Sequence, residues 1–121
     1  MSLDLFHGGG EAADGRVCLD VGHAVAEGLD PVRVLDRLGV RVAGLHLHDA
    51  VPRGPASPGD AEEAAHRPLG EGALDLDALV RALAGRSFRG PVILEVLGDQ
   101  VPSALRWREA IARVGPGGGS A

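Results

Sequence analysis

The sequence predicts an α/β fold in which three parallel strands alternate with helices. Three short apolar runs have the composition of strands that are buried on both faces. Each run is followed by a segment whose apolar residues recur at the spacing of one helix face. Because strands that alternate with helices form parallel sheets with right-handed connections, we expect the helices to cover the sheet.

The first strand is expected from Arg16 to Asp20. The helix after it begins at Asp30 and Pro31, because Asp is a favoured N-cap residue and Pro is common at the first helical position. Gly39 ends this helix. Its apolar face is formed by Val34, Leu35 and Leu38.

The second strand is expected over residues 41–47, and a loop rich in Pro, Gly and Ala follows over residues 49–72. Asp75 then caps a second helix, which ends at Gly85. The apolar face of that helix is formed by Leu76, Leu79, Val80 and Leu83.

The third strand is expected over residues 91–96, and the last helix runs from Pro102 or Ser103 to Val114. The residues of this helix that are available to pack are Leu105, Trp107, Ile111 and Val114. Residues 1–15 are expected to form a flexible lead-in, and residues 115–121 a flexible Gly-rich tail. The folded domain is therefore expected over residues 16–114.

Composition and charge limit the class of protein. A chain of 121 residues has room for one domain with a modest core, and its 45% hydrophobic content is that of a globular protein. The net charge of −5, without a basic run, argues against nucleic acid as a general partner. Cys18 is the only cysteine, so no intramolecular disulfide forms. With neither a signal peptide nor a membrane span in the sequence, a cytoplasmic location is expected.

Acidic and histidine residues occupy the ends of all three predicted strands. Asp20 closes the first strand, His46 and His48 lie at the end of the second, and Glu95 lies in the third. The C-terminal ends of parallel strands share one rim, where ligands bind, so these side chains are expected to converge. Carboxylates and an imidazole suit a divalent cation such as manganese, zinc, magnesium or cobalt. Taken singly, an Asp in the position of Asp20 is more often a turn or cap residue, and a His in a strand is more often a core or rim residue.

Four short segments together resemble one family. They are Cys18 to Ala24 (CLDVGHA), Gly44 to Asp49 (GLHLHD), His66 to Gly72 (HRPLGEG) and Val92 to Val96 (VILEV). Their order and spacing resemble the last three strands of the xylose isomerase-like barrel superfamily, which includes sugar phosphate isomerases and epimerases and the endonuclease IV-like enzymes. The resemblance extends from Gly15 to Val114. It implies a partial (β/α)8 TIM barrel, with about three C-terminal βα units and parallel strands.

The resemblance also implies roles for individual residues. It makes Asp20, His46 and Glu95 the ligands of a divalent metal, and it makes Glu95 an acid/base catalyst as well. His23 matches a position that contacts the substrate in the epimerases. The implied activity is metal-dependent isomerisation or epimerisation of a sugar or sugar phosphate, by proton transfer next to a carbonyl.

The loop between the second strand and the second helix carries further candidates. His66, Arg53 and Arg67 are candidates for substrate binding, although each is also explained as an ordinary loop residue. His66 matches a zinc-ligand position of the endonucleases, but Ala64 stands where that pattern has a metal-binding Asp. A zinc phosphodiesterase is therefore the less favoured function. The position of His48 varies in the family, so its role stays open.

The resemblance covers only part of a barrel. A complete barrel has eight strands and roughly 250 residues, and the family's remaining metal-binding Glu and second acid/base carboxylate are expected upstream of Asp20. The acidic residues there, Asp4, Glu11 and Asp14, are not in a strand-like segment. The alternative function is therefore a non-catalytic fragment, or a subunit that self-associates or binds a complementing barrel half. We expect an apolar inner face that other protein must cover, formed by Val17, Leu19, Leu45, Val92 and Leu94.

Overall fold

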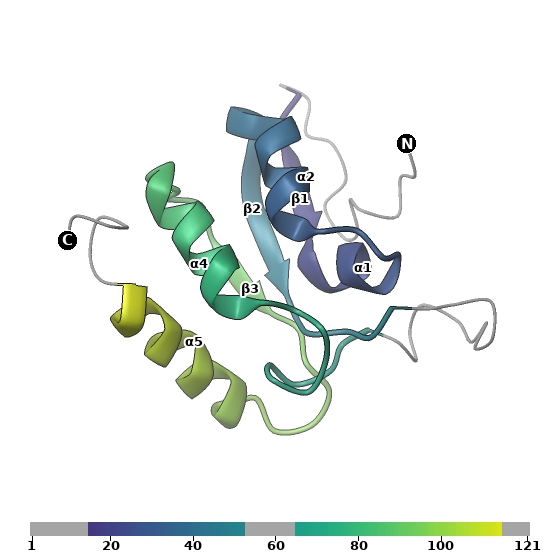
Figure 1. The fold of residues 1–121 in the computed structure, drawn as a ribbon. Coiled ribbons are helices and arrows are strands. Elements are labelled where there is room, and N and C mark those ends of the chain that lie inside the picture. The colour runs from purple at the N-terminus through teal and green to yellow at the C-terminus, as the bar shows by residue number, and fades with distance from the viewer. Residues whose placement is uncertain (1–14, 53–64, 115–121) are drawn as a thin grey trace.

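The computed structural model describes residues 15–52 and 65–114 (Figure 1). Its strands are β1 (Val17–Asp20), β2 (Val42–Leu47) and β3 (Val92–Leu94). Its helices are α1 (Val21–Ala26), α2 (Pro31–Leu38), the short 3-10 helix η2 (Gly39–Arg41), α4 (Leu76–Gly85) and α5 (Val101–Val114).

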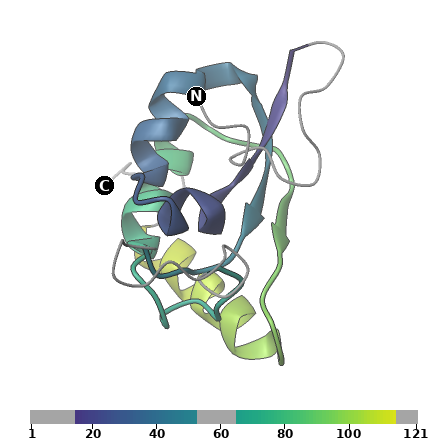
Figure 2. The same cartoon turned by 90° about the vertical axis from the view of Figure 1, so that its right-hand side faces the viewer.

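The three strands form a parallel sheet in the order β1-β2-β3. Asp20 is paired with His46 across β1 and β2, and His46 is paired with Ile93 across β2 and β3. Figure 2 shows the sheet with the helices on one of its sides. The predicted parallel α/β arrangement is therefore confirmed.

The core lies between the sheet and the helices. Leu19 of β1 and Leu45 of β2 are fully buried in one cluster with Leu35 of α2 and Leu79 of α4. Since each such side chain contributes about 1.5–3 kcal/mol when buried, this layer holds the strands in place. The positions that alternate with Leu19 and Leu45, including Asp20 and His46, belong to the other face of the sheet.

The expectation of an uncovered apolar inner face was wrong. The helices cover this face, and the residues concerned, Val17, Leu19, Leu45, Val92 and Leu94, all belong to or pack against the core. The prediction chose the wrong face of the sheet, because apolar strand residues alone do not show which face the helices cover. On the opposite face Ile93 is 50% exposed.

Local capping explains where the helices begin. The carboxylate of Asp30 accepts a hydrogen bond from the N–H of Val32, and that of Asp75 accepts one from Ala78. Gly39 follows α2 with φ of 57°, a left-handed value that favours glycine. Helices α2 and α4 are therefore confirmed at their predicted starts.

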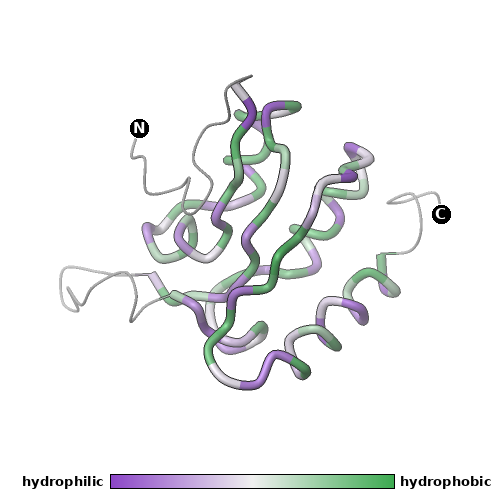
Figure 3. Tube along the Cα trace, turned by 180° about the vertical axis from the view of Figure 1, so that it is seen from behind, coloured by the Kyte–Doolittle hydropathy of each residue, from purple (hydrophilic) through white to green (hydrophobic). Residues whose placement is uncertain are grey.

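Three predictions about elements need correction. Helix α1 was not predicted, β3 is shorter than residues 91–96, and α5 begins at Val101. Of the residues expected to pack from α5, Trp107 packs against the core, whereas Leu105 and Ile111 are exposed and the small residues Ser103 and Ala110 are buried instead. Figure 3 shows the resulting mixture of hydrophobic and hydrophilic residues along this helix.

Some predictions lie outside the described residues. The tail over 115–121, all of the lead-in except Gly15, and Arg53 belong to this group. Within the described part of the chain, no helix is both long and apolar enough to cross a membrane.

Candidate metal centre

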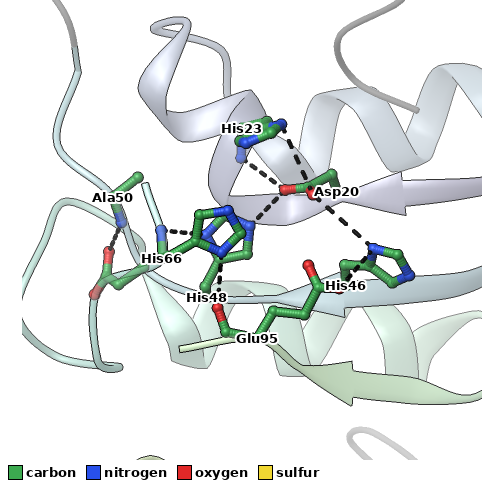
Figure 4. Close-up of polar contacts among 8 residues, drawn as sticks. Asp20, His23, His46, His48, Ala50, His66 and Glu95 are labelled. Atoms are coloured by element: carbon green, nitrogen blue, oxygen red, sulfur yellow. Dashed lines mark hydrogen bonds and ion pairs between the residues drawn. The ribbon is translucent and has the colours of Figure 1, made fainter. Parts of the chain in front are cut away.

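Asp20, His46 and Glu95 come together at the C-terminal end of the sheet (Figure 4). One ligand atom from each lies within 4.8 Å of the other two. His46 Nδ1 is 3.3 Å from Glu95 Oε2 and 4.0 Å from Asp20 Oδ2. The convergence expected from the strand ends is therefore present in the structure.

The backbone fixes these side chains in register. Asp20 and His46 are cross-strand partners in β1 and β2. Glu95 follows β3, and its N–H donates to the carbonyl of Leu47 at 2.9 Å, which extends the pairing of β3 with β2 beyond the strand. Asp20 and His46 are therefore level with each other, and Glu95 lies two positions beyond Ile93, the partner of His46, at the same end of the sheet.

Two oxygens of this group are suited to a cation. Asp20 Oδ2 and Glu95 Oε1 are buried, and among the described residues neither has a hydrogen-bond partner. A buried carboxylate oxygen without a partner is destabilising unless a charge or a donor compensates it. Two carboxylates and an imidazole form a donor set for a divalent ion such as manganese, zinc, cobalt or magnesium. The residues present therefore fit a bound divalent metal.

Asp20 is also the N-cap of α1. Its backbone is extended, with φ of −89° and ψ of 102°, and Oδ1 accepts the N–H of His23 at 2.9 Å. Burial by itself raises the pKa of this carboxyl group. The hydrogen bond from His48, together with that from the His23 N–H, outweighs burial, so the pKa of Asp20 is lower than its ordinary value. The side chain is therefore held as a carboxylate.

Three further imidazoles lie beside this centre. His23, His48 and His66 form a second group, in which one ring nitrogen from each residue lies within 4.8 Å of the other two. The rings of His48 and His66 are stacked, with centroids 4.2 Å apart, and His23 lies edge-on to both. The two histidines that the sequence offered as substrate contacts, His23 and His66, are thus adjacent to the proposed ligands.

His66 is fixed by two contacts of its side chain and backbone. Its Nδ1 lies 2.9 Å from the carbonyl oxygen of Glu95, and a carbonyl only accepts, so Nδ1 carries the proton. Its backbone has a positive φ of 59°. The N–H of Leu97 donates to the carbonyl of His66, which ties this loop to the segment after β3.

Asp49 is a residue whose role the sequence reasoning missed. Its buried carboxylate accepts four backbone N–H groups, those of Ala50, Gly70, Gly72 and Leu74. It also pairs through its backbone with Arg67. Asp49 thereby fixes the loop that brings His66 to the centre. The available signal was an acidic residue two positions after the predicted strand, with the glycines of GEG later in the same loop.

Cys18 lies on β1, two residues before Asp20. Burial raises the pKa of its thiol, and the charges of Asp20 and Glu95 raise it further. The thiol is therefore kept protonated, and the anionic ligands near the centre are carboxylates.

Comparisons with known proteins agree with the motifs. The sequence model of a family described as "xylose isomerase-like TIM barrel" matches residues 12–115. The chain is also similar to SgbU of Escherichia coli (strain K12), a protein provisionally named an L-ribulose-5-phosphate 3-epimerase. The two are 32% identical over 99 residues, a match that covers 75% of this chain and 33% of the relative. The chain therefore spans about one third of the length of that relative.

Proposed function

Because the chain belongs to the xylose isomerase-like TIM barrel family, we propose that it forms the metal-binding and substrate-binding end of a sugar isomerase or epimerase. The chain folds as a three-strand portion of a (β/α)8 barrel. The name of the similar protein from Escherichia coli supports a ketose phosphate as substrate. A cytoplasmic location is part of this proposal.

The observation that carries the proposal is the convergence of Asp20, His46 and Glu95 at the C-terminal rim of the sheet. This rim is where (β/α)8 barrels place their active sites. The three side chains would hold one divalent ion. When bound, such an ion supplies a Lewis acid that polarises a carbonyl group of the substrate.

Glu95 is the proposed proton carrier. Its side chain is 29% exposed, so a substrate can reach it, and Oε2 lies 3.3 Å from Nδ1 of His46. In this role the carboxylate of Glu95 accepts a proton from the carbon next to the substrate carbonyl. Return of a proton to the opposite face of that carbon gives the epimer, and transfer to the neighbouring carbon gives the isomer. The second carboxylate of the reaction is expected from another part of the barrel.

The proposed substrate-binding residues are His23, His66 and Arg53. His23 lies next to Asp20, with Nδ1 3.8 Å from Oδ2, and His66 is held against Glu95. Both imidazoles therefore lie within reach of a sugar hydroxyl group bound at the metal. Arg53 would complement a phosphate group.

Deuterium exchange tests the activity. A ketopentose 5-phosphate is incubated with the protein and Mn²⁺ in D₂O, and NMR follows deuterium at the carbon next to the carbonyl. Exchange that disappears in Glu95→Gln supports the proposal. Exchange that is equally fast in Glu95→Gln excludes this carboxylate as the proton carrier.

A second candidate function is that of a subunit completed by other barrel strands. The observation that favours it is the exposure of large apolar side chains from β3 to the first half of α5, where Ile93, Leu97, Val101 and Leu105 are all at least half exposed. Such a surface is typical of an interface. In this case the chain alone gives no exchange, and co-expression with a polypeptide that supplies the first five βα units of a family barrel restores it. Sedimentation that shows only monomer at all concentrations would argue against self-association through this surface.

A further inference from the structure

His48 contacts the proposed centre without belonging to the proposed ligand set. Its side chain is fully buried, and Nε2 lies 2.6 Å from Oδ1 of Asp20. On the other side of the ring, the backbone N–H of His66 donates to Nδ1 at 2.7 Å. These two contacts come from different strands and loops, and together they determine the state of the ring.

The protonation state follows from the donors and acceptors. A backbone N–H can only donate, so Nδ1 of His48 has no proton and acts as the acceptor. The proton of the neutral ring is therefore on Nε2, which donates to the carboxylate of Asp20. Both ring nitrogens are engaged, and neither can bind a metal ion without losing a hydrogen bond. The cluster of His23, His48 and His66 is for this reason a poor metal site.

The consequence for Asp20 is a fixed orientation. Oδ1 accepts two hydrogen bonds, from the N–H of His23 and from Nε2 of His48. Oδ2 has no hydrogen-bond partner among the described residues, and it is the oxygen nearer to His46 Nδ1. One carboxylate oxygen, Oδ1, is therefore held by the protein, and the other, Oδ2, is directed at the metal position.

The ring of His48 is itself held on two sides. The imidazole of His66 stacks on it with an interplanar angle of 9°. The backbone of Gly22 lies so close that a side chain there would overlap the ring. With these neighbours, the ring has little freedom to turn away from Asp20.

We propose that His48 is a positioning residue, which holds Asp20 with Oδ2 directed at the divalent ion. The proposal rests on the proposed function for the identity of the ion. It assigns to His48 the role of an outer partner that fixes the geometry of a ligand.

The test compares His48→Gln with His48→Leu. The Gln side chain keeps an N–H donor near the position of Nε2, whereas Leu has a similar volume and no donor. In calorimetric titrations with Mn²⁺, His48→Leu is expected to weaken binding by about 10- to 100-fold, the usual loss for an outer partner of a metal ligand. His48→Gln is expected to stay within a few-fold of the unmodified protein. Equal affinity in all three proteins, or equal weakening in both variants, would overturn the proposal.

NMR of the metal-free protein gives a second and independent reading. The ¹⁵N shifts of His48 are expected to show a proton on Nε2, and His48→Leu is expected to move the carboxyl ¹³C resonance of Asp20. A proton on Nδ1 instead, or an unmoved Asp20 resonance, would overturn the positioning role. If His48→Leu does not fold, the ¹⁵N shifts of His48 in the unmodified protein decide whether the positioning role holds. If that protein binds no Mn²⁺, the proposed function fails, and the NMR result still decides whether His48 positions Asp20.

Discussion

The ring of His48 fills the space that a side chain at Gly22 would need, and a Cβ atom built there overlaps Nδ1, Cε1 and Cγ. These three atoms belong to a buried ring whose two nitrogens are both hydrogen-bonded, so the ring cannot move aside easily. Gly22→Ala is therefore expected to destabilise the fold by roughly 1–3 kcal/mol, the typical cost of overpacking. Denaturant unfolding measures this change.

The matched control is Gly85→Ala. A Cβ atom at Gly85 meets nothing within 4 Å, and Gly85 is the last residue of α4. Because Ala has a higher helix propensity than Gly, this variant is expected to keep or slightly increase stability. Equal stability of the Gly22→Ala and Gly85→Ala proteins would contradict the close packing of His48 on Gly22.

Asp49 carries a separate prediction about the loop that presents His66. Asp49→Ala leaves four backbone N–H groups without their acceptor. Hydrogen bonds to a charged group contribute about 1.5–3 kcal/mol each, and these contributions are not simply additive. The free energy of unfolding is therefore expected to fall by roughly 3 kcal/mol or more. Asp49→Asn keeps one acceptor oxygen, so its stability should lie between that of Asp49→Ala and that of the unmodified protein.

Hydrogen exchange locates the effect of Asp49. The amides of Gly70, Gly72 and Leu74 are expected to exchange faster in Asp49→Ala, while that of Leu45 in the sheet changes less. Uniform acceleration across the sheet and the loop would mean that Asp49 supports global stability and has no particular role in the loop.

The parts of the fold that depend on local signals could be predicted from the sequence. Helices α2 and α4 have an Asp N-cap directly before them, and their apolar residues follow the helical period. Helix α1 was missed because it has only six residues, all of them buried, so it lacks the alternation of apolar and polar positions that marks a helix face. The side of the sheet covered by helices could not be predicted, since both faces of a short apolar strand look alike in sequence.

The site too has a part that could be predicted from the sequence and a part that could not. Parallel strands end at one rim, so the meeting of Asp20, His46 and Glu95 followed from topology. The contact of His48 with Asp20 joins residues 28 apart, and the bonds of Asp49 to the loop join residues 21 to 25 apart. Neither contact has a local pattern, because each depends on how a loop returns over the strand ends.

The ion pair between Asp77 and Arg113 gives a prediction about pH. Arg113 Nη2 donates to Asp77 Oδ1 at 2.8 Å, and this hydrogen bond holds the pKa of Asp77 below its ordinary value of 3.8. Because the folded pKa is the lower one, the pair stabilises the fold above the ordinary pKa. The contribution is lost as the pH falls through the lowered pKa.

Arg113→Gln tests this ion pair. NMR titration of the Asp77 carboxyl carbon is expected to give a higher pKa in the variant than in the unmodified protein. The change in stability should be small, because both side chains are exposed and solvent screens the pair. It should be present at about pH 7 and should decline as the pH falls below the ordinary pKa of Asp77. An Asp77 pKa that is the same in both proteins would contradict the prediction.

The central claim is that Asp20, His46 and Glu95 hold one divalent ion, and calorimetric titration with Mn²⁺ tests it most directly. The variants are Asp20→Asn and Glu95→Gln, which keep size while removing charge, and the control is Asp77→Asn, which removes an acidic group on α4. Binding of a single ion is expected in the unmodified protein and in the control. Each ligand variant should lose more than about 100-fold in affinity, since even outer partners of a ligand contribute 10- to 100-fold. Unchanged affinity in Asp20→Asn and Glu95→Gln would contradict the assignment of the metal centre.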